Sequence, residues 1–113
     1  MTVKEQILKL VGSSKTGLPY AQLTAHDEFK GSCALSHAKF PMVQYWQGLS
    51  QPAAEAILEL ATEGIIRHEP TDTLAYVAHG STLELPIFTL DQIPHAKALA
   101  KPHWMPVLLI KAQ

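Results

Sequence analysis

The sequence predicts a single α+β domain, and three observations support this prediction. Its 113 residues are 47% hydrophobic, which is enough for one domain to bury a core. Apolar residues recur at helical spacing in two segments, residues 3–11 and 51–63. Directly after the second segment, residues 65–69 and 74–79 have strand composition on either side of a turn. We expect no boundary that would divide the chain.

The first helix is expected over about residues 3–11. Thr2 and Glu5 have the spacing of a capping box, in which each side chain satisfies a backbone donor of the other, and Gly12 can end the helix. A second helix is expected to begin at Pro19 and run to about Glu28.

Residues 30–49 have the weakest secondary-structure pattern in the chain. We expect a helical insert here, with short helices over residues 33–39 and 42–47 that are separated by Pro41. Ser50 then caps a strong third helix, which has Pro52 in its first turn and ends at Gly64.

The third helix is followed by an expected β-hairpin, with residues 65–69 and 74–79 as strands and residues 70–73 as the turn. After Gly80 we expect a strand–helix–strand extension: a strand over 83–90, a helix over 91–101 capped by Asp91, and a buried strand over 107–110. This extension would complete the core or mediate dimerisation.

Residues 2–79 resemble the winged-helix family of helix-turn-helix proteins. The resemblance lies in Ile7-Leu8-x-Leu10-Val11, in Gly17-Leu18-Pro19-Tyr20-Ala21-Gln22-Leu23, and in Ser50-x-Pro52-Ala53-x-x-Ala56-Ile57-x-x-Leu60-x-x-x-Gly64-Ile65-Ile66 with the hairpin after it. It implies that the helix from Ser50 is the recognition helix and that the hairpin around Pro70 is the wing. Many members are transcriptional regulators that bind DNA as dimers. The insert at residues 30–49 and the extension over 80–113 depart from the family pattern.

Charge argues against the usual DNA-reading mode of this family. The formal net charge is −1, whereas phosphate neutralisation by basic residues supplies most non-specific DNA affinity. On a helical wheel Glu55, Glu59 and Glu63 lie opposite the apolar face of the third helix, where they would approach the phosphates. Three interpretations remain: a solvated face, a surface for a basic protein partner, or DNA contacts made elsewhere by Arg67, His68, Lys30 and Lys39.

Other candidate sites have weaker support. Cys33 and His37 would share a face of a helix as a thiolate–imidazole pair, but no third group orients them. The histidines lack the paired spacing of a structural zinc site, so we expect no metal and no cofactor. Trp46 and Trp104 are expected to pack in the core or against a partner.

The sequence thus predicts a small regulatory or binding module of winged-helix type, with weak or wing-mediated DNA binding. The alternative is a protein-interaction module that has lost DNA recognition. A third alternative is a small enzyme or ligand-binding domain that uses Cys33, His37, His95 or His103. We expect a cytoplasmic protein without a membrane span, because the chain has one cysteine and no long apolar run, and a homodimer, because only 17% of its residues are charged.

Overall fold

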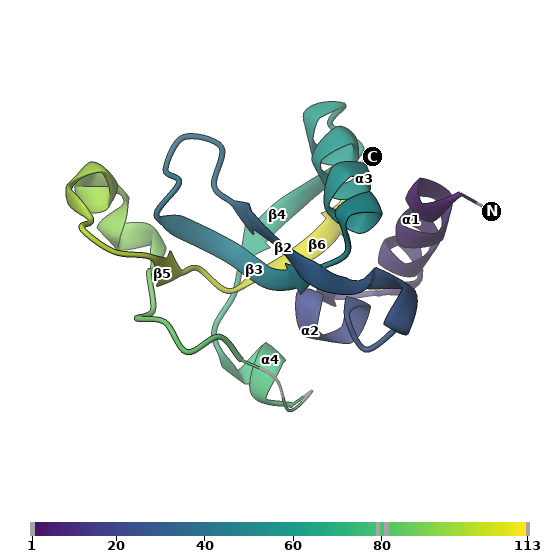
Figure 1. Ribbon diagram of the computed structural model, residues 1–113, viewed down its shortest axis with the longest axis horizontal. Helices are drawn as coiled ribbons and strands as arrows, with labels where there is room; N and C mark the ends of the chain where they lie inside the picture. The colour runs from purple at the N-terminus through teal and green to yellow at the C-terminus, as the bar shows by residue number, and fades with distance from the viewer. Residues whose placement is uncertain (1, 79, 81, 113) are drawn as a thin grey trace.

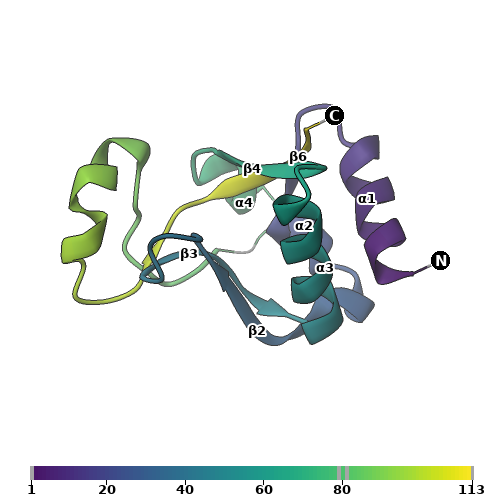
Figure 2. The ribbon, with the colours of Figure 1, turned by 90° about the horizontal axis from the view of Figure 1, so that it is seen from above.

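The computed structural model describes residues 2–78, 80 and 82–112, and it is a mixed α+β fold with two small three-stranded sheets. One sheet has the strand order β1-β6-β4 and the other β2-β3-β5. Figures 1 and 2 show the β2–β3 hairpin crossing the β4–β6 pair, with α1 at one end of the molecule and residues 90–98 at the other. The α+β class is therefore confirmed.

The first helix, α1, spans Val3–Ser13, and its capping box is present. The backbone N–H of Glu5 donates to Thr2 Oγ1 over 3.1 Å, and the backbone N–H of Thr2 donates to Glu5 Oε1 over 3.2 Å. Ile7 and Val11 are buried, as their helical spacing predicts. The predicted helix and its capping box are confirmed, but Gly12 does not end the helix, which continues through it to Ser13.

The third predicted helix is α3, Gln51–Thr62. Ser50 Oγ accepts a hydrogen bond from the N–H of Ala53 over 3.3 Å and so caps the helix, and Gly64 follows it with φ +74°. The buried residues of α3 lie on one face: Ala53, Ala56, Ile57 and Leu60.

The second predicted helix is wrong in length. After the two-residue strand β1, Leu18–Pro19, helix α2 covers only Tyr20–Leu23, and a single 3-10 turn, η1, follows at Asp27–Phe29. Residues 24–28 contain no large apolar side chain that could stabilise a longer helix by packing on the core, and Phe29 is buried instead.

The helical insert predicted for residues 30–49 is also wrong. These residues form an antiparallel pair, β2 (Lys30–Ser36) and β3 (Val43–Leu49), with several register shifts in β2. The strand form buries Val43, Trp46 and Leu49, and the Trp46 ring packs 5.1 Å from that of Tyr76. Burial of this apolar surface outweighs the weak local preference for helix.

The predicted wing hairpin does not form as a local pair. Strand β4, Ile66–Pro70, pairs with β6, Val107–Lys111, so that Ile66 lies opposite Lys111 and Pro70 opposite Val107. Residues of the expected second strand instead form a short helix, α4 (Leu74–Val77), where Asp72 Oδ1 accepts from the N–H of Leu74. His79, the last residue of that expected strand, lies outside the described residues.

The C-terminal extension is partly as predicted. β6 is the expected buried strand. Residues 83–90 form no strand beyond a bridge between Ile87 and Trp104, and the helix is a 3-10 helix, η2 (Leu90–Ala98). Its cap is Thr89 with Gln92 rather than Asp91, and Pro94 inside it removes a backbone donor. β5, His103–Trp104, runs parallel to the start of β3.

Candidate functional site: an apolar groove

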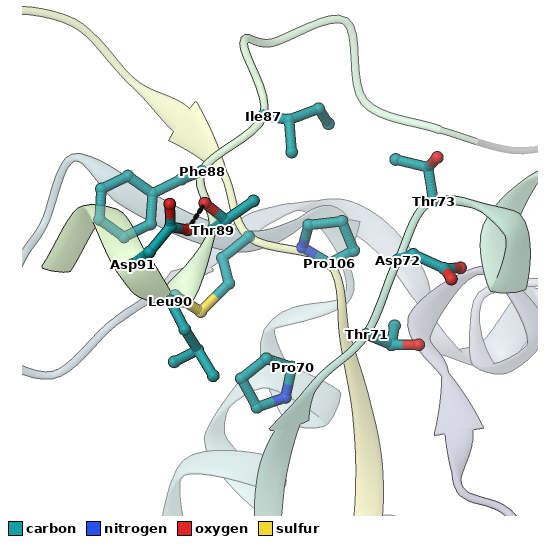
Figure 3. A pocket seen from close by; sticks show the side chains of 11 residues that line it. Pro70, Thr71, Asp72, Thr73, Ile87, Phe88, Thr89, Leu90, Asp91 and Pro106 are labelled. Atoms are coloured by element: carbon teal, nitrogen blue, oxygen red, sulfur yellow. Dashed lines mark hydrogen bonds between the residues drawn. The ribbon is translucent and has the colours of Figure 1, made fainter.

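A groove of about 530 Å³ lies beside the end of β4 (Figure 3). Three chain segments that are far apart in the sequence meet there: the end of β4 with the loop into α4, the start of η2, and the link between β5 and β6. The lining residues are Pro70, Thr71, Asp72, Thr73, Ile87, Phe88, Thr89, Leu90, Asp91, Met105 and Pro106.

Backbone hydrogen bonds hold the three segments together. The N–H of Thr71 donates to the carbonyl of Pro106 over 2.9 Å, which extends the β4–β6 ladder to the edge of the groove. The N–H of Phe88 donates to the carbonyl of Trp104 over 2.8 Å, and the N–H of Trp104 donates to that of Pro86 over the same distance. The groove is therefore preformed by the fold, since its walls do not depend on a ligand to bring them together.

The groove is apolar at its base and at part of its rim. Phe88 and Met105 are buried, whereas Ile87 and Leu90 are 42% and 58% exposed. Leu74 directly follows the lining residue Thr73, and Val77 lies one turn further along α4; they are 70% and 58% exposed. Six large hydrophobic side chains are exposed in the described part of the chain. Two of them, Ile87 and Leu90, line this groove, and two more, Leu74 and Val77, lie on α4, the helix that follows the lining residue Thr73.

The two carboxylates of the groove accept hydrogen bonds from residues close to them in the chain. Asp72 Oδ1 accepts from the N–H of Leu74 over 3.0 Å, and Asp91 accepts from the hydroxyl of Thr89. In Figure 3 the Asp72 carboxylate points toward α4 and away from the hollow. The lining includes no lysine, arginine, histidine or cysteine, so it offers no nucleophile–base pair. The arrangement suits binding of an apolar group rather than catalysis.

The tertiary structure places His68 in a second cluster, between the two sheets. Its Nε2 lies 2.6 Å from the hydroxyl of Tyr20, and its ring stacks on that of Tyr45 with centroids 4.2 Å apart. Burial, with a smaller contribution from the nearby His37, lowers the pKa of His68 to about 4. Burial also raises the pKa of Tyr20 well above its usual value. His68 is therefore neutral at pH 7 and supplies no positive charge for a phosphate.

The other candidate DNA-contacting residues do not converge. Arg67 pairs with Glu69 on the same strand over 3.2 Å, and Lys30 pairs with Asp27 over 3.4 Å. Lys30 begins β2, whereas Lys39 lies beyond its other end, and a strand of seven residues is roughly 20 Å long. These residues therefore do not form one basic patch.

The acidic residues of α3 are exposed, as the helical wheel predicts. Two of them face a cation from α1: Lys4 Nζ lies 2.7 Å from Glu63 Oε1 and 3.4 Å from Glu59 Oε2. Glu55 accepts a hydrogen bond from Gln51 over 3.1 Å. The acidic face is thus partly neutralised from within the chain, and it is less available to a basic partner than the sequence suggests.

The two tryptophans lie in the core and not on a surface of the single chain. Trp46 is 3% exposed and Trp104 is 1% exposed, and their rings are 6.0 Å apart. The indole N–H of Trp104 donates to the carbonyl of Tyr45 over 3.0 Å. Of the two predicted uses, packing in the core or against a partner, the structure places both side chains in the core.

The hypothetical pair of Cys33 and His37 does not form. Cys33 lies in β2, where four residues of extended chain span roughly 13 Å, and the side chain of His37 accepts from the N–H of Lys39 instead. Within residues 2–78, 80 and 82–112, His, Cys, Asp and Glu side chains nowhere gather in a group of three that could hold a metal ion. The helices in the same part of the chain are all too short or too polar to cross a membrane.

The sequence did not predict the groove, because its lining residues were assigned to separate elements: residues 70–73 to a hairpin turn, residues 87–90 to a strand and Asp91 to a helix. One local signal was present: Leu74 and Val77 have the spacing of one helical turn, and they lie in α4. Comparison with known proteins adds no assignment: no protein-family model, no curated protein and no solved structure matches this chain.

Proposed function

We propose that this chain is a protein-interaction module of winged-helix type, and that its apolar groove binds a partner segment with apolar side chains flanked by lysine or arginine. The observation that carries the proposal is the concentration of exposed hydrophobic side chains around a preformed groove. Exposed apolar patches with a polar rim are typical of interaction sites.

The order of elements supports the winged-helix part of the proposal. α1, α2 and α3 follow one another as the three helices of the resemblance, and strand β4 begins directly after α3. The hairpin β2–β3 is then an insert between the second and third helices. Residues 71–106, including α4 and η2, stand between β4 and its partner β6, where the resemblance places the tip of the wing.

Three features favour a protein partner over duplex DNA. The outer face of α3 is acidic, and its nearest cation, Lys4, is engaged by Glu59 and Glu63. The candidate contacts Arg67 and Lys30 are paired with carboxylates. A surface of this kind gains little from counterion release, which supplies most of the non-specific affinity for DNA.

Charge complementarity defines the partner further. The only charged residues that line the groove are Asp72 and Asp91, and both are exposed. A partner with Lys or Arg beside its apolar side chains would gain attraction at this rim, whereas an acidic partner would be repelled. The apolar side chains would supply affinity, and the rim would select the sign of the partner's charge.

The test is a selection of short random peptides against the immobilised chain, followed by affinity measurements with groove variants. We expect the enriched peptides to combine apolar and basic residues. Leu90→Ser is expected to weaken their binding about tenfold or more, because burial of a leucine side chain is worth about 1.5–3 kcal/mol. The matched control is Leu58→Ser, since Leu58 is 59% exposed on α3 and lies outside the groove.

Sedimentation of the free chain over a range of concentrations and a duplex-DNA titration at two salt concentrations complete the test. A dimer that Leu90→Ser dissolves would make the second copy the occupant of the groove. The proposal is wrong if Leu90→Ser affects neither peptide binding nor self-association. Tight DNA binding that weakens steeply with salt would instead support the DNA-binding regulator that the sequence also predicts.

A further inference from the structure

The turn between β2 and β3 meets η2 in a second, smaller pocket of about 230 Å³. It is distinct from the groove, and no residue lines both. The lining residues are Lys39, Phe40, Pro41, Met42, Ala96, Lys97 and Leu99.

Two lysines from distant parts of the sequence line this pocket. Lys39 comes from the β2–β3 turn and Lys97 from the last turn of η2. Neither forms an ion pair with a carboxylate of the described residues, whereas Lys4, Lys30 and Arg67 each do. No carboxylate lines the pocket. Because two lysines and no carboxylate line it, the pocket carries positive charge, and an anion with two negative charges would complement that charge.

The rest of the lining is apolar. Phe40 and Leu99 are partly buried, and Met42 is 39% exposed. A free inorganic anion would leave this surface unused, so the lining favours an anionic group with a short hydrocarbon body. The volume lies below the roughly 300–1,000 Å³ of sites for drug-sized ligands, which limits the body to a few carbon atoms.

The walls of the pocket are held by the fold. The N–H of His103 donates to the carbonyl of Met42 over 2.7 Å, and His103 lies opposite Val43 where β5 pairs with β3. The ring of His37 lies 4.9 Å from that of Phe40 and supports the turn from the other side. The chain that leads away from Lys97 is thus fixed against the strand that follows Lys39.

We propose that this pocket binds small phosphate monoesters as dianions, with one lysine on each side of the phosphate and the apolar lining against the ester group. The charge of about −2 that a phosphate monoester carries above its second pKa of about 6 matches the two lysines. This proposal uses none of the groove residues and does not depend on the proposed protein partner.

The experiment is a titration of the chain, labelled with ¹⁵N, with butyl phosphate at pH 8 and low salt, followed by amide chemical shifts. We expect saturable shifts at residues 39–42 and 96–99, with a Kd on the order of 1 mM for a ligand this small. Lys39→Gln and Lys97→Gln are each expected to weaken binding about fivefold or more, because each removes one of two charges that face the phosphate. The matched control is Lys15→Gln, in an exposed turn away from the pocket.

Two further probes separate the contribution of the second negative charge from that of the hydrocarbon body. Butyl sulfate has the same shape and a single charge, and we expect it to bind several-fold more weakly; inorganic phosphate lacks the apolar body and is expected to bind more weakly as well. The proposal is overturned if no shifts saturate, if butyl sulfate binds as well as butyl phosphate, or if Lys15→Gln weakens binding as much as Lys97→Gln. Leu90→Ser is expected to leave butyl phosphate binding unchanged. The experiment therefore distinguishes a failure of the phosphate proposal from a failure of the proposed partner binding in the groove.

Discussion

His68 is expected to make this protein less stable at pH 5 than at pH 7, because its ring takes up a proton more readily in the unfolded chain than in the folded chain. The ring is held neutral in the folded chain, where its pKa is about 4 against an ordinary value of 6.5. In the unfolded chain the ring takes up a proton as the pH falls below 6.5, and this favours unfolding. The stabilisation from the neutral ring is thus fully present above pH 6.5 and is lost progressively as the pH falls to about 4.

The magnitude follows from the two pKa values. At about 1.4 kcal/mol for each pH unit, a lowering from 6.5 to about 4 is worth about 3 kcal/mol when fully expressed. Between pH 7 and pH 5 the free energy of unfolding falls by about 2 kcal/mol of these roughly 3 kcal/mol. His37, whose pKa is also lowered by burial, acts in the same direction with a smaller effect. The groups that contact or influence the His68 ring are the Tyr20 hydroxyl, the Tyr45 ring and the His37 ring, and none of them is an anion at these pH values.

The assay is urea unfolding at pH 7 and pH 5 for the parent chain and for His68→Gln. The variant loses ring stacking and is expected to be less stable at both pH values, so the quantity compared is the change between them. We expect the parent chain to lose about 2 kcal/mol more than the variant over this interval. His95→Gln, which removes an exposed histidine, serves as the control and should behave like the parent chain. Equal losses in the parent chain and in His68→Gln would refute the reasoning, because they would show that folding does not hold this ring neutral.

Two other substitutions test the packing. Tyr76→Phe is expected to lower the free energy of unfolding in urea by about 1–3 kcal/mol. The buried hydroxyl donates to the carbonyl of Val107 over 2.6 Å and accepts from the N–H of Tyr20 over 3.0 Å, and both partners would lose their hydrogen bond. A change below about 0.5 kcal/mol would mean that water replaces the hydroxyl. Gly31→Ala is expected to lower the melting temperature, since an added Cβ would lie 2.6 Å from the Leu49 carbonyl oxygen. Gly12→Ala lies in an open helical position and should raise the free energy of unfolding by about 0.5–1 kcal/mol. Thermal unfolding followed by circular dichroism checks this pair, and a stable Gly31→Ala variant would contradict the close approach of β2 to the start of α3.

The sequence by itself determined the elements whose signals are local. α1 is set by a capping box between residues three apart and by apolar spacing over two turns, and α3 is set by Ser50, its helix-forming residues and Gly64. The burial of β6 follows from a short apolar run. In each case the interactions that decide the structure join residues within a few positions of one another, so that they can be read along the chain.

Only the tertiary structure decided the pairing of the strands and the location of the candidate sites. β4 pairs with β6 across some forty residues, and that pairing displaced the local hairpin which its composition suggests. Residues 42–47 became a strand because Trp46 has Tyr76 and Trp104 to pack against, which no local pattern records. The groove and the lysine pocket are each assembled from segments that are far apart in the sequence. The free energy of such contacts depends on the whole fold, and therefore the chain's local patterns could not predict them.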